Sequence, residues 1–339
     1  MQEESSIKNK LFRWSNSKLR KLNKREAETI VELREEASSR KYYRLLVDGG
    51  SFIGVFSPPE KEPIKRFLDI NKIFISQGIS VPKILSFDAK KGFMLVEDFG
   101  DSVFQYNLNS ENASSFYTMA FNELILIQSI ANPKIPSISK EEAFRQMSLF
   151  EEWFLINLLD IKISGSLKKL ITKSYDLILE DFFSQPQVIC HFDFESRNLM
   201  VLKNGKAGVL DFQDAVKGPI FLDPAALIKD LYQDWSEEQI DMLLGIYLSK
   251  AQESGLVSLS DELKLQRWFD LAGLQRQLRI LGTLSRLYLR DKKSFRLPDL
   301  EKTLLLCIRS SSKYKDLSQL ANFLDSLLPE LNNRLKNIL

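Results

Sequence analysis

The alternation of hydrophobic and polar residues divides the chain into a short strand-rich part and a long helix-rich part. Between residues 40 and 97, short runs rich in β-branched and aromatic residues predict four strands, and one stretch near helical period predicts a helix. Asp48-Gly49-Gly50 is a typical hairpin turn between the first two strands, and Gly78 is placed to end the helix. This part is therefore predicted to be a small α+β unit.

Helical periodicity dominates the rest of the chain, where a β-rich island at 187–211 is the one interruption. The helices are predicted over 111–130, 140–160, 165–182, 223–233, 236–254, 260–290, 298–311 and 315–337. A further helix, rich in Lys, Arg and Glu, is predicted over 17–37. The pattern predicts an α+β fold with a helical extension at 1–37, a small antiparallel-sheet N-lobe at 38–98 and a larger, mostly helical C-lobe at 99–339.

The β-rich island carries a high density of polar side chains. Its run CHFDFESRNLMV holds the only histidine of the chain, followed by two acidic residues, an arginine and an asparagine. Asn204-Gly205 is a turn signal, so the residues after it return as the second strand of a hairpin. We expect Asp193, Asn198 and Asp211 to lie at the ends of neighbouring strands and to face one pocket. Their carboxylate and carboxamide oxygens suit a hard cation, foremost Mg²⁺ bound together with substrate phosphates.

Composition and charge narrow the candidate functions. Hydrophobic residues make up 44% of the 339 residues, and the net charge of +2 gives no argument for a nucleic-acid partner. The two cysteines stand in no metal-ligand spacing, which fits a reducing compartment. No stretch approaches the roughly 18 apolar residues of a membrane span, and the polar N-terminus does not resemble a signal peptide. We expect a cytoplasmic monomer that binds neither nucleic acid nor membrane.

The spacing H-x-D-x-x-x-x-N, followed by a hairpin and a further Asp, matches the catalytic loop of the kinase fold. In that chemistry the first Asp accepts the proton of the attacking hydroxyl, while the Asn and the later Asp hold Mg²⁺ against the nucleotide phosphates. These roles fall on Asp193, Asn198 and Asp211. His191 is expected to orient or pack rather than to carry a proton. A loop of capping acids around a structural histidine is the alternative explanation.

A longer stretch, HFDFESRNLMVLKNGKAGVLDFQDAVKGPIFLDPAALIKDLY, resembles the aminoglycoside phosphotransferase-like kinases. Within them it is most similar to the anomeric N-acetylmuramate/N-acetylglucosamine kinases of bacterial cell-wall recycling. Further matching stretches, such as GLQRQLRILG, extend the resemblance over about residues 38–300. The resemblance implies a bilobal protein-kinase-like fold. It also implies phosphorylation of a sugar hydroxyl, with ATP and Mg²⁺ as cofactors and a small sugar as substrate.

The resemblance also implies where the ligands bind. The N-lobe would clamp ATP, and the adenine would meet the backbone of a hinge near residues 97–100. The candidate ATP-binding residues are Ser38, Ser39, Arg40, Arg44, Glu97 and Phe99. The candidate sugar-binding residues are Glu195, Arg197, Gln213, Asp214, Trp153 and Arg276. Trp153 could stack on a pyranose ring or pack between helices, and Arg276 could meet an anionic group or carry solvated charge.

Two departures from the kinase pattern fall in the N-lobe. A kinase usually has a Gly-rich loop and a strand lysine at the phosphates, but here the loop position is EEASSRKYYR and the strand SFIGVFSPP has no lysine. Either Ser hydroxyls and backbone N–H groups hold the phosphates with Arg40, Lys41 or Arg44, or the chain is a pseudokinase. The mixed charges of the C-lobe favour a neutral or anionic amino sugar. Kinases of the aminoglycoside, choline or homoserine type remain alternatives.

Overall fold

The computed structural model describes residues 2–33, 39–258 and 262–338 of the chain. Contacts between residues divide the chain into two compact units. The first, which we call the sheet unit, joins Met1–Asn107 to Arg197–Asp214. The second, the helical unit, joins Leu108–Ser196 to Ala215–Leu339. The segment Arg197–Asp214 thus belongs to the sheet unit, whereas the sequence placed it with the helical part.

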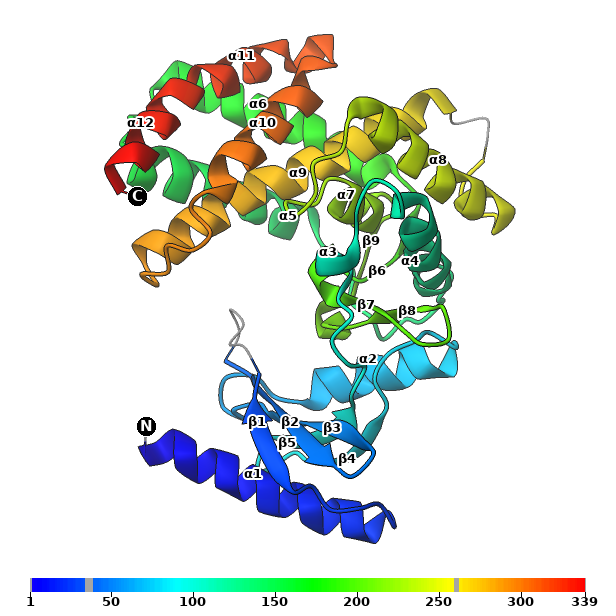
Figure 1. Cartoon of the computed structure of the whole chain (residues 1–339). Helices are drawn as coiled ribbons and strands as arrows, with labels where there is room; N and C mark the ends of the chain where they lie inside the picture. Colours follow the sequence, from blue (N-terminus) through cyan, green and yellow to red (C-terminus); the bar gives the residue numbers. More distant parts are fainter. Residues whose placement is uncertain (1, 34–38, 259–261, 339) are drawn as a thin grey trace. The chain divides into compact units, whose positions relative to one another are not determined.

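A five-stranded antiparallel sheet with the order β1-β2-β3-β5-β4 forms the centre of the sheet unit (Figure 1). Its strands are β1 (Thr29–Glu32), β2 (Lys41–Val47), β3 (Gly50–Phe56), β4 (Ile84–Asp88) and β5 (Phe93–Glu97). The hairpin between β2 and β3 forms as expected, with Val47 opposite Gly50 and a positive φ of 83° at Gly49. The four predicted strands are confirmed, and β1 adds a fifth at the edge.

Helix α1 (Gln2–Lys21) covers one face of this sheet, and α2 (Lys65–Ser76) lies on the other side (Figure 1). Leu11 and Leu19 of α1 are fully buried in clusters with apolar residues of β2 and β5. The helix predicted over 17–37 was wrong in its bounds, because residues 29–32 form β1 and pair with β2. A run of Lys, Arg and Glu does not reveal this pairing, which depends on a distant strand.

The segment Arg197–Asp214 contains the expected hairpin, made of β7 (Leu199–Val201) and β8 (Ala207–Val209), which are joined by an antiparallel ladder. Two backbone hydrogen bonds of 2.7 Å tie it to the rest of the sheet unit, from Val201 N–H to the carbonyl of Ser102 and from Val209 N–H to that of Ser80. After β8, the ring of Phe212 packs on Phe67 of α2 at 4.8 Å between centroids. The hairpin is therefore anchored to α2 and to the chain that follows β5.

Most of the predicted helices form, but those expected over 140–160 and 315–337 are each divided in two, and that expected over 223–233 ends at Ile228. Helices make up most of the helical unit. They are α4 (Ala113–Gln128), α5 (Lys140–Leu149), the π-helix η1 (Phe150–Leu158), α6 (Gly165–Ser184), α7 (Leu222–Ile228), α8 (Glu237–Glu253), α9 (Glu262–Leu289), α10 (Asp299–Ser312), α11 (Ser318–Ser326) and α12 (Leu328–Ile338). A two-stranded antiparallel sheet, β6 (Gln187–Cys190) with β9 (Val216–Pro219), completes the unit. The sequence predicted β6 but did not identify β9 as its partner.

The 28-residue helix α9 is the central element of this unit and contacts α5, η1, α6, α7 and α10. At Gly282 it approaches the end of α5 so closely that an added Cβ would lie 2.2 Å from the carbonyl carbon of Leu149. Only glycine permits this approach. The long amphipathic segment predicted over 260–290 is therefore a buried support for the elements around it.

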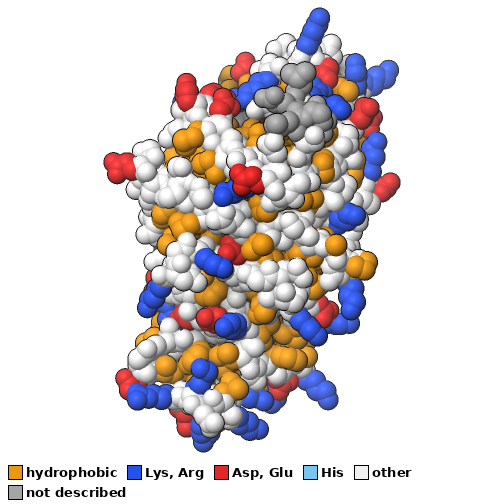
Figure 2. All heavy atoms as spheres, turned by 90° about the vertical axis from the view of Figure 1, so that its right-hand side faces the viewer, with side chains coloured by type: hydrophobic (Ala, Val, Ile, Leu, Met, Phe, Trp, Pro, Cys, Tyr) orange, Lys and Arg blue, Asp and Glu red, His pale blue; other side chains and the backbone are white. Residues whose placement is uncertain are grey.

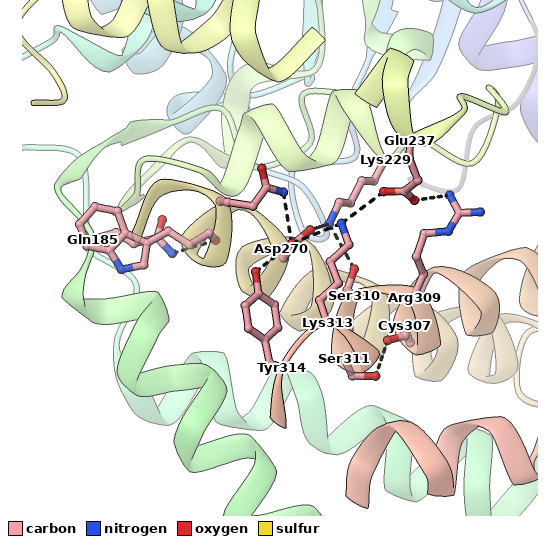
Figure 3. A network of polar contacts seen from close by, with 12 residues as sticks. Gln185, Lys229, Glu237, Asp270, Cys307, Arg309, Ser310, Ser311, Lys313 and Tyr314 are labelled. Atoms are coloured by element: carbon pink, nitrogen blue, oxygen red, sulfur yellow. Dashed lines mark hydrogen bonds and ion pairs between the residues drawn. The ribbon is translucent and has the colours of Figure 1, made fainter. Parts of the chain in front are cut away.

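A buried polar network joins α9 to its neighbours (Figure 3). The Lys229 ammonium, just after α7, donates to Asp270 of α9 at 2.7 Å and to Ser310 of α10 at 3.1 Å. Tyr314 donates to the other carboxylate oxygen of Asp270 at 2.9 Å. Burial is the largest single influence on Asp270 and would raise its pKa, but the charge and hydrogen bond of Lys229, together with the charge of Lys313, outweigh it and lower that pKa. The network fixes the end of α7 against two longer helices.

The surface carries charges of both signs. On the face drawn in Figure 2, Lys and Arg side chains are interspersed with Asp and Glu, in keeping with the net charge of +2. Among the helices of the described ranges, none is both long and apolar enough to cross a membrane.

Candidate active site

The polar loop after β6 is held by a buried carboxylate. Asp223, in the first turn of α7, accepts hydrogen bonds from the backbone N–H groups of His191 at 2.6 Å and Phe192 at 2.9 Å. Phe192 has a φ of 83°, in the left-handed region that bulky residues rarely adopt. Burial raises the pKa of Asp223 to about 6, although His191 and the two N–H groups oppose this change. The carboxylate thus fixes the turn that leads the chain from β6 into Asp193.

His191 has a structural environment. Its side chain is fully buried, and its ring meets Phe194 edge-on at 5.6 Å between centroids. A buried ring packed in this way is suited to support the loop, and the orienting or packing role of His191 remains a prediction.

Two arginines of α9 reach the acidic side chains of the same loop. Arg279 Nη2 donates to Asp193 Oδ1 at 3.4 Å, and the guanidinium lies over the Phe192 ring at 4.6 Å from its centroid. Arg276 forms a buried ion pair with Glu195. The Asp193 side chain remains 30% exposed, so a substrate hydroxyl can approach its carboxylate.

The end of the loop is fixed by a second buried carboxylate. Asp230, just beyond α7, accepts a hydrogen bond from the Ser196 N–H at 2.8 Å. Burial and then the nearby charge of Glu195 raise the pKa of Asp230. The helical unit therefore holds the backbone of the loop at both ends. Asp230 was not predicted from the sequence, where it is an acidic residue between Lys229 and Leu231 with no motif around it.

Asn198 and Asp211 come next to each other through the pairing of β7 with β8 in the sheet unit. Leu199 lies opposite Val209, and the N–H of Leu210 donates to the Asn198 carbonyl at 2.9 Å. Asp211 follows directly, with a positive φ of 58°. Gln213 Nε2 donates to Asp211 Oδ1 at 2.9 Å and so orients the carboxylate.

Tyr42 of β2 lies near the same carboxylate. Burial, reinforced by the negative charge of Asp211, raises the pKa of Tyr42 to about 12. Tyr42 points away from the face of β2 that α1 covers, because side chains alternate along a strand and its neighbour Tyr43 packs on that face. Asp211 therefore belongs with the sheet face where Arg40 and Arg44 lie.

The donor set of Asn198 and Asp211 fits Mg²⁺. Both offer hard oxygen atoms, and both side chains are partly exposed. Among the described residues there is no group of three His, Cys, Asp or Glu that would hold a metal by itself. Mg²⁺ commonly takes one or two protein ligands and completes its octahedron with phosphate oxygens and water. The residues present match that kind of site.

Arg40 is the buried cation on this face of the sheet. Its Nε donates to Ser57 Oγ at 3.2 Å and lies 3.4 Å from a carboxylate oxygen of Glu62, and its guanidinium lies 5.7 Å from the ring centre of Phe67. The N–H of Ser39 donates to the other oxygen of Glu62 at 3.2 Å. Ser38, also expected near ATP, falls outside the described residues.

Arg44 is held by the segment that follows β5. It donates to Asp98 at 2.6 Å, to Asp101 at 2.7 Å and to the carbonyl of Gly100 at 3.0 Å. Phe99 of this segment packs on Gly208, where an added Cβ would lie 2.6 Å from the ring. The contacts of Arg44 thus hold residues 98–101, the segment of the expected hinge, against β2. Contact between Arg44 and phosphate remains a prediction.

Glu97 lies at the end of β5, where its N–H donates to the carbonyl of Lys83 at 2.9 Å. This bond belongs to the edge of the sheet, directly before the expected hinge. The role of Glu97 in nucleotide binding remains a prediction.

The predicted sugar contacts fall into two groups. Glu195, Arg276 and Trp153 belong to the helical unit, and the first two bind each other. Trp153 is half-buried in η1. Arg197, Gln213 and Asp214 belong to the sheet unit. Gln213 is buried and Asp214 exposed.

The chain is similar to known phosphotransferases over most of its length. The model of the phosphotransferase enzyme family (APH) matches residues 29–256. The N-acetylmuramate/N-acetylglucosamine kinase of Neisseria meningitidis serogroup B is 32% identical over 299 residues, covering 86% of this chain and 89% of that protein. The kinase of the same name from Pseudomonas aeruginosa is 29% identical over 299 residues, covering 88% of each.

Solved structures show the same fold. The ADP-bound aminoglycoside phosphotransferase APH(2'')-Ib matches with a TM-score of 0.58 and 16% identity, over 86% of this chain and 97% of that one. An ethanolamine kinase of Plasmodium vivax matches with a TM-score of 0.60 and 15% identity, over 83% and 82%. The fold is protein-kinase-like, as expected. On the strength of the matched family model and these relatives, the chain belongs to the phosphotransferase enzyme family.

Proposed function

We propose that this phosphotransferase is an ATP-dependent sugar kinase that phosphorylates the anomeric hydroxyl of N-acetylmuramate, N-acetylglucosamine or both. The relatives that bear these names are similar over most of the chain. The observation that carries the proposal is the polar loop 191–198, which presents a partly exposed carboxylate at Asp193. Asn198 follows five residues later in the same loop. Its carbonyl accepts a hydrogen bond from the N–H of Leu210, the residue before Asp211.

Asp193 is the proposed acceptor of the sugar proton. A carboxylate within hydrogen-bond reach of a hydroxyl can take its proton as the oxygen attacks. The anomeric oxygen then forms a bond to the γ-phosphorus of ATP, while the bond from that phosphorus to the bridging oxygen of ADP breaks. The products are a sugar 1-phosphate and ADP, and the proton remains on Asp193 until solvent removes it.

Asn198 and Asp211 are the proposed Mg²⁺ ligands. When bound, Mg²⁺ neutralises charge on the β- and γ-phosphates. Gln213 supports this role, because its hydrogen bond to Asp211 fixes the carboxylate. Arg40 stands two residues before Tyr42 and is paired with Glu62. It is the proposed source of the positive charge that a strand lysine supplies in other kinases.

We place the reaction in the cytoplasm, where ATP is available. The free thiols of Cys190 and Cys307 are buried and fit a reducing compartment.

The test is ADP release by the purified protein with Mg-ATP and a panel of N-acetylmuramate, N-acetylglucosamine, glucosamine, choline and kanamycin. We expect turnover on an N-acetyl sugar and a product identified by NMR as the 1-phosphate. Asp193→Asn should lower kcat by about 10²–10⁴-fold, because the amide cannot accept the proton. Asp325→Asn, on the exposed side of α11, is the matched control and should retain full activity.

Turnover on choline or kanamycin alone would assign the chain to another substrate class. Full activity of Asp193→Asn would remove the proposed base. If no compound of the panel gave ADP release and the protein did not bind ATP, the pseudokinase alternative would be favoured.

A further inference from the structure

We infer that Arg279 of α9 is a positioning residue for the reaction, because it holds Phe192 and Asp193 in the arrangement that presents the carboxylate to the substrate. The inference rests on the proposed role of Asp193. It gives α9 a function beyond packing, since the same helix also binds Glu195 through Arg276.

Phe192 has an unusual backbone conformation. A φ of 83° strains the backbone of a bulky residue and persists only where the surroundings enforce it. Asp223 holds the N–H of Phe192 at 2.9 Å, and Arg279 lies on its ring at 4.6 Å from the centroid. The backbone contact and the ring contact come from different elements, α7 and α9, and together they fix the residue directly before Asp193.

The side chain of Asp193 has a direct contact with Arg279. Asp223 and Asp230 bind backbone groups of the loop, so neither contact determines where the Asp193 carboxylate points. The hydrogen bond from Arg279 Nη2 to Asp193 Oδ1, at 3.4 Å, acts on the carboxylate itself. Arg279 therefore links helix α9 directly to the carboxylate of Asp193, the proposed proton acceptor.

Placing the Arg279 guanidinium in this buried position carries a desolvation cost. The Arg279 side chain is only 16% exposed, and burial lowers its pKa, although the charge of Asp193 opposes this change. Arg276, one turn away, adds a like charge. A buried charge is retained where it is paired and hydrogen-bonded. Here the partners are the ring of Phe192 and the carboxylate of Asp193, which indicates a role at the loop.

The kinetic test uses the full-length protein and three variants. Arg279→Met keeps the length of the side chain but removes its charge and its donors, and Arg279→Lys keeps the charge. Arg286→Met, two turns further along α9 and partly exposed, is the matched control. We expect Arg279→Met to lower kcat by about 10- to 100-fold, with KM for ATP and for the sugar within about threefold of wild type, as for a catalytic group that is misplaced by an ångström.

Arg279→Lys should recover a large part of the lost kcat, and Arg286→Met should match wild type. An unchanged kcat in Arg279→Met would overturn the inference. A change confined to KM for the sugar would also overturn it, because Arg279 would then bind substrate.

A structural test keeps the inference independent of the substrate. Crystal structures of wild type and Arg279→Met, both without ligands, should differ at residues 191–196, with Phe192 out of the left-handed region and the Asp193 carboxylate displaced. Superimposable loops would overturn the positioning role whatever the kinetics. Absence of turnover by wild type on the sugar panel would count against the proposed function alone, since the crystallographic difference does not depend on it.

Discussion

At the scale of single residues, the loop of the candidate active site is held mostly by carboxylates that accept backbone N–H groups. Asp223 binds two such groups and Asp230 one, and both carboxylates are buried. A buried acceptor is tolerated because its hydrogen bonds replace part of the lost hydration. These acids therefore serve the geometry of the loop, while Asp193, which is partly exposed, remains open to chemistry.

Asp223 gives a testable pH dependence. Its pKa is raised by burial to about 6, from an ordinary value of 3.8. The folded protein therefore holds this proton more tightly than the unfolded chain, so the contribution of the group to stability is fully present below about pH 4. That contribution is lost as the pH rises through 6. Asp223→Asn removes the titrating group and keeps one acceptor.

We expect the free energy of unfolding of wild type, relative to that of Asp223→Asn, to fall by about 2–3 kcal/mol between pH 4 and pH 7. Urea unfolding of both proteins across this range measures it. Parallel pH profiles of the two proteins would contradict the assignment.

The residues of the loop were partly accessible from sequence. The spacing from His191 to Asn198 indicated the catalytic loop, and the turn at Asn204-Gly205 predicted the hairpin that brings Asn198 beside the residue before Asp211. Pairing of Glu195 with Arg276 was not predictable, because 81 residues separate them and spacing along the chain carries no information about such contacts. Both are predicted sugar-binding residues, and the structure pairs them with each other.

At the scale of elements, α9 depends on close packing and on buried ion pairs, of which Lys229 with Asp270 is one. Gly282 lets the helix approach the backbone at Leu149, where a methyl group has no room. Sequence periodicity predicted this helix well, but a glycine in the middle of a helix usually only weakens it. Its role here follows from the neighbouring element.

Gly282→Ala tests that role against a matched glycine. Although alanine has the higher helix propensity, we expect this change to lower the free energy of unfolding by about 1–3 kcal/mol, because the added Cβ would displace α5. Gly245 of α8 is exposed, and nothing lies within 4 Å of an added Cβ. Gly245→Ala should stabilise the protein by about 0.5–1 kcal/mol. Denaturant unfolding compares the two, and equal effects would show that Gly282 is an ordinary helical glycine.

The pair of Lys229 with Asp270 yields a double-mutant cycle. Lys229→Met leaves the Asp270 carboxylate buried without its main counter-charge, and we expect a loss of about 3–5 kcal/mol. Asp270→Asn alone should also destabilise, since it leaves the ammonium of Lys229 buried. The double variant Lys229→Met/Asp270→Asn should lose clearly less than the sum of the two single changes. Additive losses, measured by urea unfolding, would mean that the two groups act independently.

Several elements could not be derived from local pattern. The strand β1 exists because it pairs with β2, and β9 exists because it pairs with β6, so both depend on partners distant in the chain. The continuous helix expected over 140–160 changes to π-helical geometry at Phe150. Amphipathic periodicity does not distinguish an α-helix from a short π-helical segment such as η1.

At the scale of the whole molecule, the sheet unit is assembled from two stretches separated by 89 residues of the helical unit, residues 108–196. From the sequence we predicted an N-lobe that is one continuous stretch, because the pattern changes from strand-rich to helix-rich after residue 100. The β7–β8 hairpin lies about 100 residues further along the chain, so its place in the sheet unit was not predicted. What joins the second stretch to the first is packing, above all Phe212 against Phe67 and Phe74 of α2.

Loss of that packing should be costly. Phe212 is 1% exposed, and we expect Phe212→Ala to lower the free energy of unfolding by about 3–5 kcal/mol. Phe87, which is 52% exposed on β4, is the control, and Phe87→Ala should change stability by about 0.5 kcal/mol or less. Thermal unfolding followed by circular dichroism measures both. Similar midpoints for the two variants would show that the second stretch is only loosely attached.

The division of the sheet unit has a consequence for its synthesis. When residue 107 leaves the ribosome, Phe212 has not yet been synthesised. The apolar face of α2 on which Phe212 will pack is therefore still exposed. At typical elongation rates of roughly 5–20 residues per second, the missing stretch arrives many seconds later. The helical segment made in between emerges before the sheet unit can close. The nascent chain thus exposes an unfinished apolar surface for longer than a contiguous lobe would, and during that interval it is a natural client for a chaperone.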